Sequence, residues 1–218
     1  TVPVPQADLD EAVPLSLLPE HGLGMSSALG LHGHCQGRSW SSQFQLSSVS
    51  IIADGLQIMC QDQLAELQVG WTIKLSPETD ILQLQCSVKN LSEQPYELQQ
   101  LNLTWPLAGN FNELMTFYGR WSHEFYTERQ HWDLGIYQRE NRKGRTSHDN
   151  PPYLLVGERG FGQTYGIVAG FHLAWSGSHQ YRAERLNDGR RLVQFSEALF
   201  PGEIALKSGE IYSTCHFS

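Results

Sequence analysis

Alternation of apolar and polar residues is the feature that most constrains the fold of this chain. From residue 67 to residue 75, an apolar side chain occupies every second position, and residues 82–88 repeat the pattern. Successive side chains of a β-strand point to opposite faces of its sheet, so this period predicts two half-buried strands. The turn-forming segment Ser76–Asp80 separates them. Together these segments predict an antiparallel hairpin with Cys86 on its inward face.

The same period predicts further strands along the chain. They cover residues 101–105, which stop at Pro106, the long segment Tyr165–Trp175, and the short segments 192–195 and 204–206. No segment carries the apolar stripe of a helix, which recurs every three to four residues. The sequence therefore predicts an all-β fold, a large antiparallel sandwich. One domain of this class can span residues 1–218.

Composition and charge exclude several classes of function. The formal net charge is -8, so no dense positive field is available for nucleic acid or an anionic membrane. No apolar run approaches the roughly 20 residues of a membrane-spanning helix. Four scattered cysteines without a Cys-x-x-Cys pair favour a reducing, cytoplasmic location, although two disulfides in a secreted protein stay an alternative. Because the chain starts at Thr1 rather than Met, we expect an excised fragment whose natural N-terminus, with any signal peptide, is not seen.

Residues 117–153 concentrate polar and aromatic side chains, which makes this stretch the candidate binding face. Arg145 and Asn150 carry groups that suit sugar hydroxyls, while Trp121 and Trp132 offer flat rings to the apolar side of a pyranose. The alternative is a loop that satisfies its own hydrogen bonds and packs on a neighbouring domain. The residues alone do not separate these two interpretations.

Three carboxylates in this stretch are candidates for catalysis of sugar hydrolysis, which needs two of them at one bond. They are Glu124, Glu128 and Asp133. Glu128 stands beside Arg129, which favours a simple ion pair, and Glu124 fits a solvated or ion-paired side chain equally well. We therefore favour a structural role for all three.

Other motifs also lead to structural interpretations. Ser147 and His148 are neighbours, and adjacency alone makes no nucleophile and base, so we expect them to bond the loop backbone or a ligand. The cluster His32–Cys35 lacks a second group of ligands at metal spacing, so neither a metal nor another cofactor is predicted. The glycines of Gly160–Gly166 precede a strand rather than a helix, which indicates a turn and not a dinucleotide loop.

Several blocks of the sequence resemble the N-terminal domain of glycoside hydrolase family 36, the family of bacterial α-galactosidases and raffinose-type hydrolases. The segment Glu113–Glu124 resembles the G-R-W-x-x-E block of the family, and Arg142–Pro151 resembles its R-x-G-x-x-S-H-x-x-N-P block. The remaining blocks lie in the expected order and cover nearly the whole chain: Pro14–Gly24, Gly37–Trp40, Leu199–Glu203 and Ser208–Tyr212.

The resemblance implies a β-supersandwich related to the galactose-mutarotase fold. In the family this domain precedes a (β/α)8 barrel that holds both catalytic aspartates of a retaining mechanism, and no part of this chain resembles that barrel. We therefore expect a non-catalytic N-terminal domain of an enzyme that hydrolyses terminal α-galactosides such as melibiose and raffinose. The expected partners are its own barrel, neighbouring subunits and the α-galactoside, with no nucleic acid and no membrane.

The resemblance also directs attention to particular residues. The family's G-x-G-D-F-R segment corresponds to Gly22–Ser27, which lacks the Asp and the Arg, so Arg38 becomes the candidate for that sugar contact. The residues expected at the substrate entrance or at an interface are Arg38, Trp40, Trp121, Arg145, Ser147, His148 and Asn150.

Two other functions stay open at this point. One is a stand-alone mutarotase or epimerase, with His123 and Glu124, or His148 and Glu158, as acid and base. The other is a carbohydrate-binding module.

Overall fold

The computed structural model describes residues 13–25 and 28–218, which form an all-β molecule. Within these two ranges there are sixteen strands, and every strand pair is antiparallel. One turn of 3-10 helix, η2 (His21–Leu23), is the only helix in this part of the chain. No helix of the described residues has the length and apolarity to cross a membrane. The predicted fold class is confirmed.

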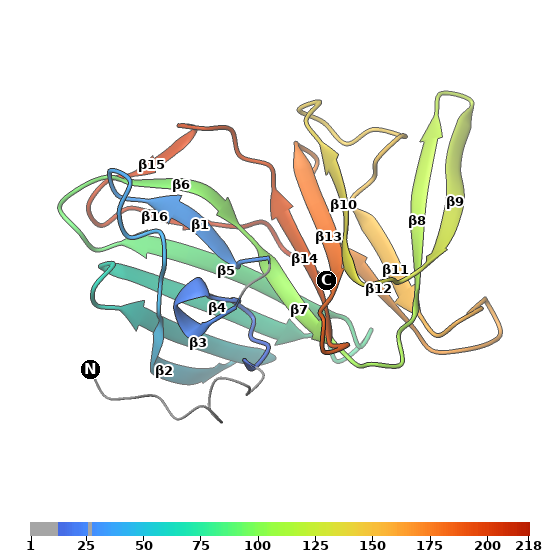
Figure 1. Cartoon of the computed structure of the whole chain (residues 1–218), viewed down its shortest axis with the longest axis horizontal. Coiled ribbons are helices and arrows are strands. Elements are labelled where there is room, and N and C mark those ends of the chain that lie inside the picture. Colours follow the sequence, from blue (N-terminus) through green and yellow to red (C-terminus); the bar gives the residue numbers. More distant parts are fainter. Residues whose placement is uncertain (1–12, 26–27) are drawn as a thin grey trace.

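The strands of one half of the molecule form a five-stranded and a three-stranded sheet (Figure 1). The five-stranded sheet has the order β16 (Ile211–Ser213), β5 (Leu82–Asn90), β4 (Leu67–Leu75), β3 (Gly55–Asp62), β2 (Gln45–Ile52). The three-stranded sheet has the order β1 (Leu31–His34), β6 (Tyr96–Leu101), β15 (Ile204–Leu206).

The other half is built from two four-stranded sheets (Figure 1). The first has the order β10 (Gly135–Asn141), β13 (His179–Arg185), β14 (Arg191–Glu197), β7 (Leu103–Leu107). The second has the order β12 (Val168–His172), β11 (Tyr153–Gly157), β8 (Glu113–Arg120), β9 (His123–His131).

The predicted hairpin of residues 67–88 is confirmed as β4 and β5. Its register pairs Leu67 with Asn90 and Leu75 with Leu82, so the alternating apolar residues of both strands share one face. Cys86 lies on that face and is 1% exposed, as its inward position in the pattern predicts. The segments 192–195 and 204–206 also lie in strands, β14 and β15.

Two strand predictions were wrong in their bounds. Residues 101–105 divide between β6 and β7 at Asn102, and β7 continues through Pro106. A proline is tolerated there because β7 is the edge of its sheet, where a missing N–H breaks no ladder. The segment Tyr165–Trp175 forms a strand only over β12, because Tyr165 closes a turn with Gly162 and Gly166 has a φ of +81°.

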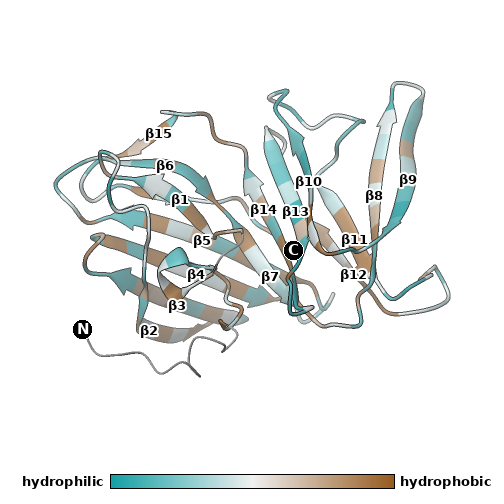
Figure 2. Ribbon diagram, in the orientation of Figure 1, coloured by the Kyte–Doolittle hydropathy of each residue, from teal (hydrophilic) through white to brown (hydrophobic). Residues whose placement is uncertain are grey.

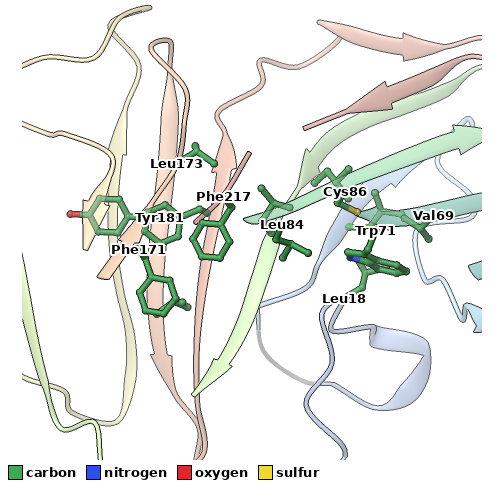
Figure 3. Packing of buried hydrophobic residues seen from close by; sticks show 14 of the residues in the cluster. Leu18, Val69, Trp71, Leu84, Cys86, Phe171, Leu173, Tyr181 and Phe217 are labelled. Atoms are coloured by element: carbon green, nitrogen blue, oxygen red, sulfur yellow. The ribbon is translucent and has the colours of Figure 1, made fainter. Parts of the chain in front are cut away.

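One hydrophobic core continues through both halves of the molecule. Phe217 joins them: its backbone bridges Leu84 of β5 and Leu173 beyond β12. Figure 3 shows its ring between Phe171 on one side and Leu84 on the other. The ring centroid of Phe217 lies 5.6 Å from that of Phe171 and 4.9 Å from that of Phe195. The sheets therefore form one extended sandwich rather than two separate ones.

Candidate functional site

The β8–β9 hairpin presents the exposed aromatic residues of the stretch 117–153. In Figure 1 this hairpin stands at the edge of the molecule, with its tip away from the core. The register shifts between Tyr118 and Arg120, and Ser122 has a φ of 67°, so the tip forms a tight turn. Trp121 lies in that turn and is 82% exposed. Phe125 and Tyr126 of the same hairpin are also exposed, and such a cluster of exposed aromatic rings is typical of a contact surface.

Polar side chains of the loop between β10 and β11 fix its shape, and Arg139 of β10 ties it to the β8–β9 hairpin. The Asp149 carboxylate accepts hydrogen bonds from the Lys143 ammonium group and the Ser147 hydroxyl, and these bonds, that from Lys143 first, lower the pKa of Asp149 to about 2. The Arg139 guanidinium donates to the Asp149 carbonyl oxygen at 2.6 Å and to the Phe117 carbonyl oxygen at 2.8 Å. Arg139 thereby ties the loop to the end of β8.

Hairpin and loop enclose a shallow cleft of about 340 Å³. The Trp121 and His148 rings meet edge to face at its rim, 6.3 Å between centroids. This volume is at the lower end of the range for small-molecule sites, about 300–1,000 Å³. The cleft combines aromatic faces with hydrogen-bonding groups, and its lining residues are Phe125, Arg145, Thr146, Ser147, His148, Pro151 and Tyr153.

The predicted site residues fall into three places. Trp121, Arg145, Ser147 and His148 lie at or beside the cleft. Asn150 is 7% exposed and lies beneath the loop, and its Oδ1 has no hydrogen-bond partner among the described residues. The Asn150 amide is therefore covered, although the sequence suggested an exposed amide that could hydrogen-bond sugar hydroxyls.

Arg38 and Trp40 lie apart from the cleft, in the chain between β1 and β2. A two-residue turn at Gln36 and Gly37, both with positive φ, pairs Cys35 with Arg38. Trp40 is 58% exposed and contacts the His21 ring, 5.2 Å between centroids. Six of the seven predicted residues thus lie at two separate surfaces, one in each half of the molecule, and Asn150 is buried beneath the loop.

Two interpretations of the sequence were wrong in this region. Trp132 is 1% exposed, so it packs in the core instead of offering a face to a sugar. Arg129 pairs with Glu113 and places its guanidinium 4.3 Å from the Phe161 ring centroid, instead of pairing with Glu128. Adjacent residues of a strand point to opposite faces, so the Glu128 carboxylate does not form an ion pair with Arg129.

Two of the three carboxylates considered as catalytic groups, Glu124 and Asp133, have structural partners. Glu124 accepts the Ser122 backbone N–H at 2.8 Å within the hairpin turn, and this bond is the main cause of its lowered pKa. Asp133 lies 2.9 Å from the Nδ1 atom of His131. Nothing in this arrangement aims two carboxylates at one point above the cleft.

The acid–base pairs of a mutarotase are likewise not assembled. The His123 Nδ1 atom lies 3.1 Å from the Tyr126 hydroxyl, on the hairpin, while Glu124 is engaged in the turn. His148 precedes β11, whereas Glu158 follows its far end and accepts the Ile167 N–H at 3.2 Å. The two members of that pair therefore lie at opposite ends of a strand.

Sequence reasoning missed a row of aromatic rings behind the cleft. Tyr153 of β11 stacks with Phe125 of β9 at 6.5 Å and meets His172 of β12 at 4.9 Å, both between centroids. Phe117 of β8 meets the same Tyr153 ring at 6.4 Å. These residues come from four strands, so only the strand register could have revealed that they are neighbours.

The histidines and cysteines that were considered as metal ligands form the last group of candidates. His32 and His34 lie on β1, and the His34 Nε2 atom is 3.8 Å from the Glu97 carboxylate. Across residues 13–25 and 28–218, no group of three His, Cys, Asp or Glu side chains is arranged to hold a metal ion. All four cysteines are free thiols.

Comparison with known proteins places the chain in a family. The profile described as "Glycosyl hydrolase family 36 N-terminal domain" matches residues 2–207. The sequence is 36% identical to the "Alpha-galactosidase" of Escherichia coli, over 98% of this chain and 31% of that protein. It is 26% identical to the "Bifunctional alpha-galactosidase/sucrose kinase AgaSK" of Mediterraneibacter gnavus, over 74% of this chain and 17% of that protein.

Solved structures agree on the fold. The galactosidase domain of AgaSK superposes with a TM-score of 0.81 at 20% identity, over 92% of this chain and 30% of that chain. The α-galactosidase AgaA of Geobacillus stearothermophilus gives a TM-score of 0.80 at 17% identity, over 92% of this chain and 31% of that one. The chain thus spans about a third of the length of each of these two structures.

Proposed function

The chain belongs to the glycosyl hydrolase family 36 N-terminal domains, and from this premise we propose that it serves as the non-catalytic sandwich of a retaining α-galactosidase. The complete protein would hydrolyse terminal α-galactosides such as melibiose and raffinose, with its catalytic aspartates outside residues 1–218. The four free thiols support a cytoplasmic setting for it.

One observation carries this proposal: nearly the whole chain aligns with only a third of an α-galactosidase. The alignment covers 98% of this chain and 31% of the Escherichia coli protein. A domain that is a minor part of its relatives, and whose Glu124 and Asp133 carboxylates are engaged in local structure, is best suited to supporting a catalytic domain.

The role of the cleft follows from its exposed aromatic rim. We assign Trp121, His148 and Arg145 to a surface that docks on the catalytic barrel and shapes the substrate entrance. The loop beneath is fixed by Asp149 and Arg139, so this surface is already formed before a partner meets it. Arg38 and Trp40, in the other half, are assigned to contact with a neighbouring subunit.

The gene that encodes this chain supplies the direct test. We expect its reading frame to continue beyond Ser218 into a barrel, and the complete product to release galactose from melibiose and raffinose. The isolated chain should neither hydrolyse these sugars nor accelerate the mutarotation of α-galactose in a polarimeter. A stop codon after Ser218, or catalysed mutarotation by the chain, would overturn the proposal.

Substitution tests the role of the cleft in the complete protein. Trp121→Ala should raise KM for raffinose or weaken barrel docking, because the indole is expected to be buried there. Leu64→Ala is the matched control, since Leu64 is 97% exposed in the turn between β3 and β4. Equal kinetic constants for the two variants would mean that Trp121 does not contribute to the substrate entrance. Heat of galactose binding to the isolated chain in calorimetry would favour a carbohydrate-binding module instead.

A further inference from the structure

The last residues of the chain run as an extended segment between β5 and β12. Phe217 exchanges two backbone hydrogen bonds with Leu84 of β5, at 2.7 and 2.9 Å, and Ser218 exchanges two with His172 of β12, at 2.6 and 2.9 Å. The bridges from Phe217 to Leu84 and to Leu173 are both antiparallel. In Figure 1 the C-terminal end accordingly lies between the two halves of the molecule. This short segment links the five-stranded sheet to the sheet that contains β12.

An apolar groove lies beside Ser218, between the start of β5 and β12. Its volume is about 280 Å³, and it is lined by Leu82 of β5, Phe171 of β12, and Trp105 and Leu107 of β7. Figure 2 shows hydrophobic residues along both β7 and β12. The volume is below the range of small-molecule sites, about 300–1,000 Å³, and two sides of the groove are strand edges. These features fit a short extended peptide better than a compact ligand.

Both edges direct backbone hydrogen-bonding groups into this groove. Alternate residues of an antiparallel strand turn both their N–H and C=O groups to the same side. Because Leu84 bonds to the end segment, Leu82 directs its groups to that side too, and His172 sets the same direction for Gly170. Among the described residues no strand reaches these groups, since β12 is the edge of its sheet and β16 ends opposite Ser87. A strand in the groove can therefore bond on both sides.

We propose that this groove holds the residues that follow Ser218 in the complete protein, as a β-strand that pairs with β5 and β12 at once. The inference rests on the proposed function, under which the chain continues beyond Ser218. Extension of the observed register puts the first residue after Ser218 opposite Leu82 on one side and Phe171 on the other. The second then lies opposite Ile81 and Gly170.

The register also predicts the chemistry of this strand. Side chains directly opposite one another share a face of the sheet, and Leu84, Phe217 and Leu173 form such a row, each 2% exposed or less. Two positions further along the same face lie Phe171, which is 9% exposed, and the first residue after Ser218. We therefore expect an apolar residue at that position.

Continuity of the chain favours this occupant over a strand from elsewhere. The groove begins where Ser218 ends, so the next residues are held at its entrance at a high effective concentration. A separate strand would have to end against the chain at that point. The relative from Escherichia coli is about three times as long as its match to this chain. A link that is bonded along both edges would hold the sandwich and the catalytic barrel in one fixed orientation.

Hydrogen exchange in the complete protein tests the pairing. We expect the amides of Leu82 and Gly170 to exchange about a hundredfold more slowly than in an unstructured peptide, because each bonds to the added strand. Proline in place of the first residue after Ser218 removes an N–H donor, so both amides should then exchange about tenfold faster. Alanine at the same position keeps the donor and is the matched control. Unchanged protection of the β4 amides shows that each variant is folded.

The outcomes separate this inference from the proposed function. Wild-type amides of Leu82 and Gly170 that exchange as in an unstructured peptide would overturn the pairing, even in a protein that hydrolyses α-galactosides. Protection that proline leaves unchanged would also overturn it. Slow exchange in a protein without that activity would support the pairing and overturn the enzyme function alone. A stop codon directly after Ser218 would overturn both.

Discussion

Two buried carboxylates fix the segment that leads into β2. Glu20 is 7% exposed and accepts the Phe44 N–H at 2.7 Å, and Asp62 is 6% exposed and accepts the Gln43 N–H at 2.7 Å. Burial raises the pKa of Glu20 to about 7, and the nearby charge of Asp62 acts in the same direction. The folded chain therefore binds a proton at Glu20 more tightly than the unfolded chain does.

This raised pKa predicts a pH dependence of stability. Because the folded pKa of about 7 exceeds the ordinary value of 4.5, stability should fall as pH rises from 4.5 through 7. Glu20→Gln is uncharged at every pH and should remove this fall, which we expect to be on the order of 1–3 kcal/mol. Urea unfolding of both proteins at several pH values measures it. A wild-type free energy of unfolding that rises over this window relative to Glu20→Gln would contradict the prediction.

Two tryptophans show how far the sequence alone predicts the environment of a side chain. Composition directed attention to the stretch that contains Trp121 and His148, whose rings meet at the rim of the cleft. It could not separate Trp121, 82% exposed, from Trp132, 1% exposed, because both lie among similar polar neighbours. Burial of Trp132 depends on which sheet covers it, and no local pattern contains that information.

At the scale of elements, the alternation of apolar and polar residues predicts a strand reliably only where one face of that strand is buried along its whole length. The β4–β5 hairpin meets that condition, and its residues alternate as predicted. Residues 165–175 alternate as well, but Gly166 turns the chain before β12 begins. The neighbours of Tyr153 in the aromatic row come from separate strands, so the row depends on register. The sequence therefore predicts strands better than it predicts the site they form.

The β8–β9 hairpin depends on the glycine of its G-R-W block. A Cβ atom at Gly119 would lie 2.4 Å from the His123 carbonyl oxygen, a backbone atom of the facing strand. We expect Gly119→Ala to lower the free energy of unfolding by about 1–3 kcal/mol, because the turn must shift to relieve the overlap. Gly162→Ala is the control, since nothing lies within 4 Å of its added Cβ. Urea unfolding compares the two, and equal losses would mean that the close approach at Gly119 is relieved without cost.

At the scale of the whole molecule, Phe217, near the end of the chain, is one of the residues that join the two halves. Phe217 pairs through its backbone with Leu84 and Leu173, and its ring packs against Phe171 and Phe195. Residues 211–218 show no extended period that would have predicted this position. The sequence predicts a sandwich, but part of the contact between its halves comes from long-range contacts of this short segment.

Removal of the Phe217 ring should destabilise both halves of the molecule together. Phe217 is 2% exposed, so we expect Phe217→Ala to lower the free energy of unfolding by about 3–5 kcal/mol through the cavity it leaves. Phe200→Ala is the matched control, because Phe200 is 46% exposed and should tolerate the same truncation with little loss. Urea unfolding, followed by tryptophan fluorescence and by far-ultraviolet circular dichroism, measures both variants. Since one core serves both halves, wild type and Phe217→Ala should each unfold in a single transition with coincident probes. Two separate transitions in the wild type would mean that the halves fold independently and that Phe217 does not join them.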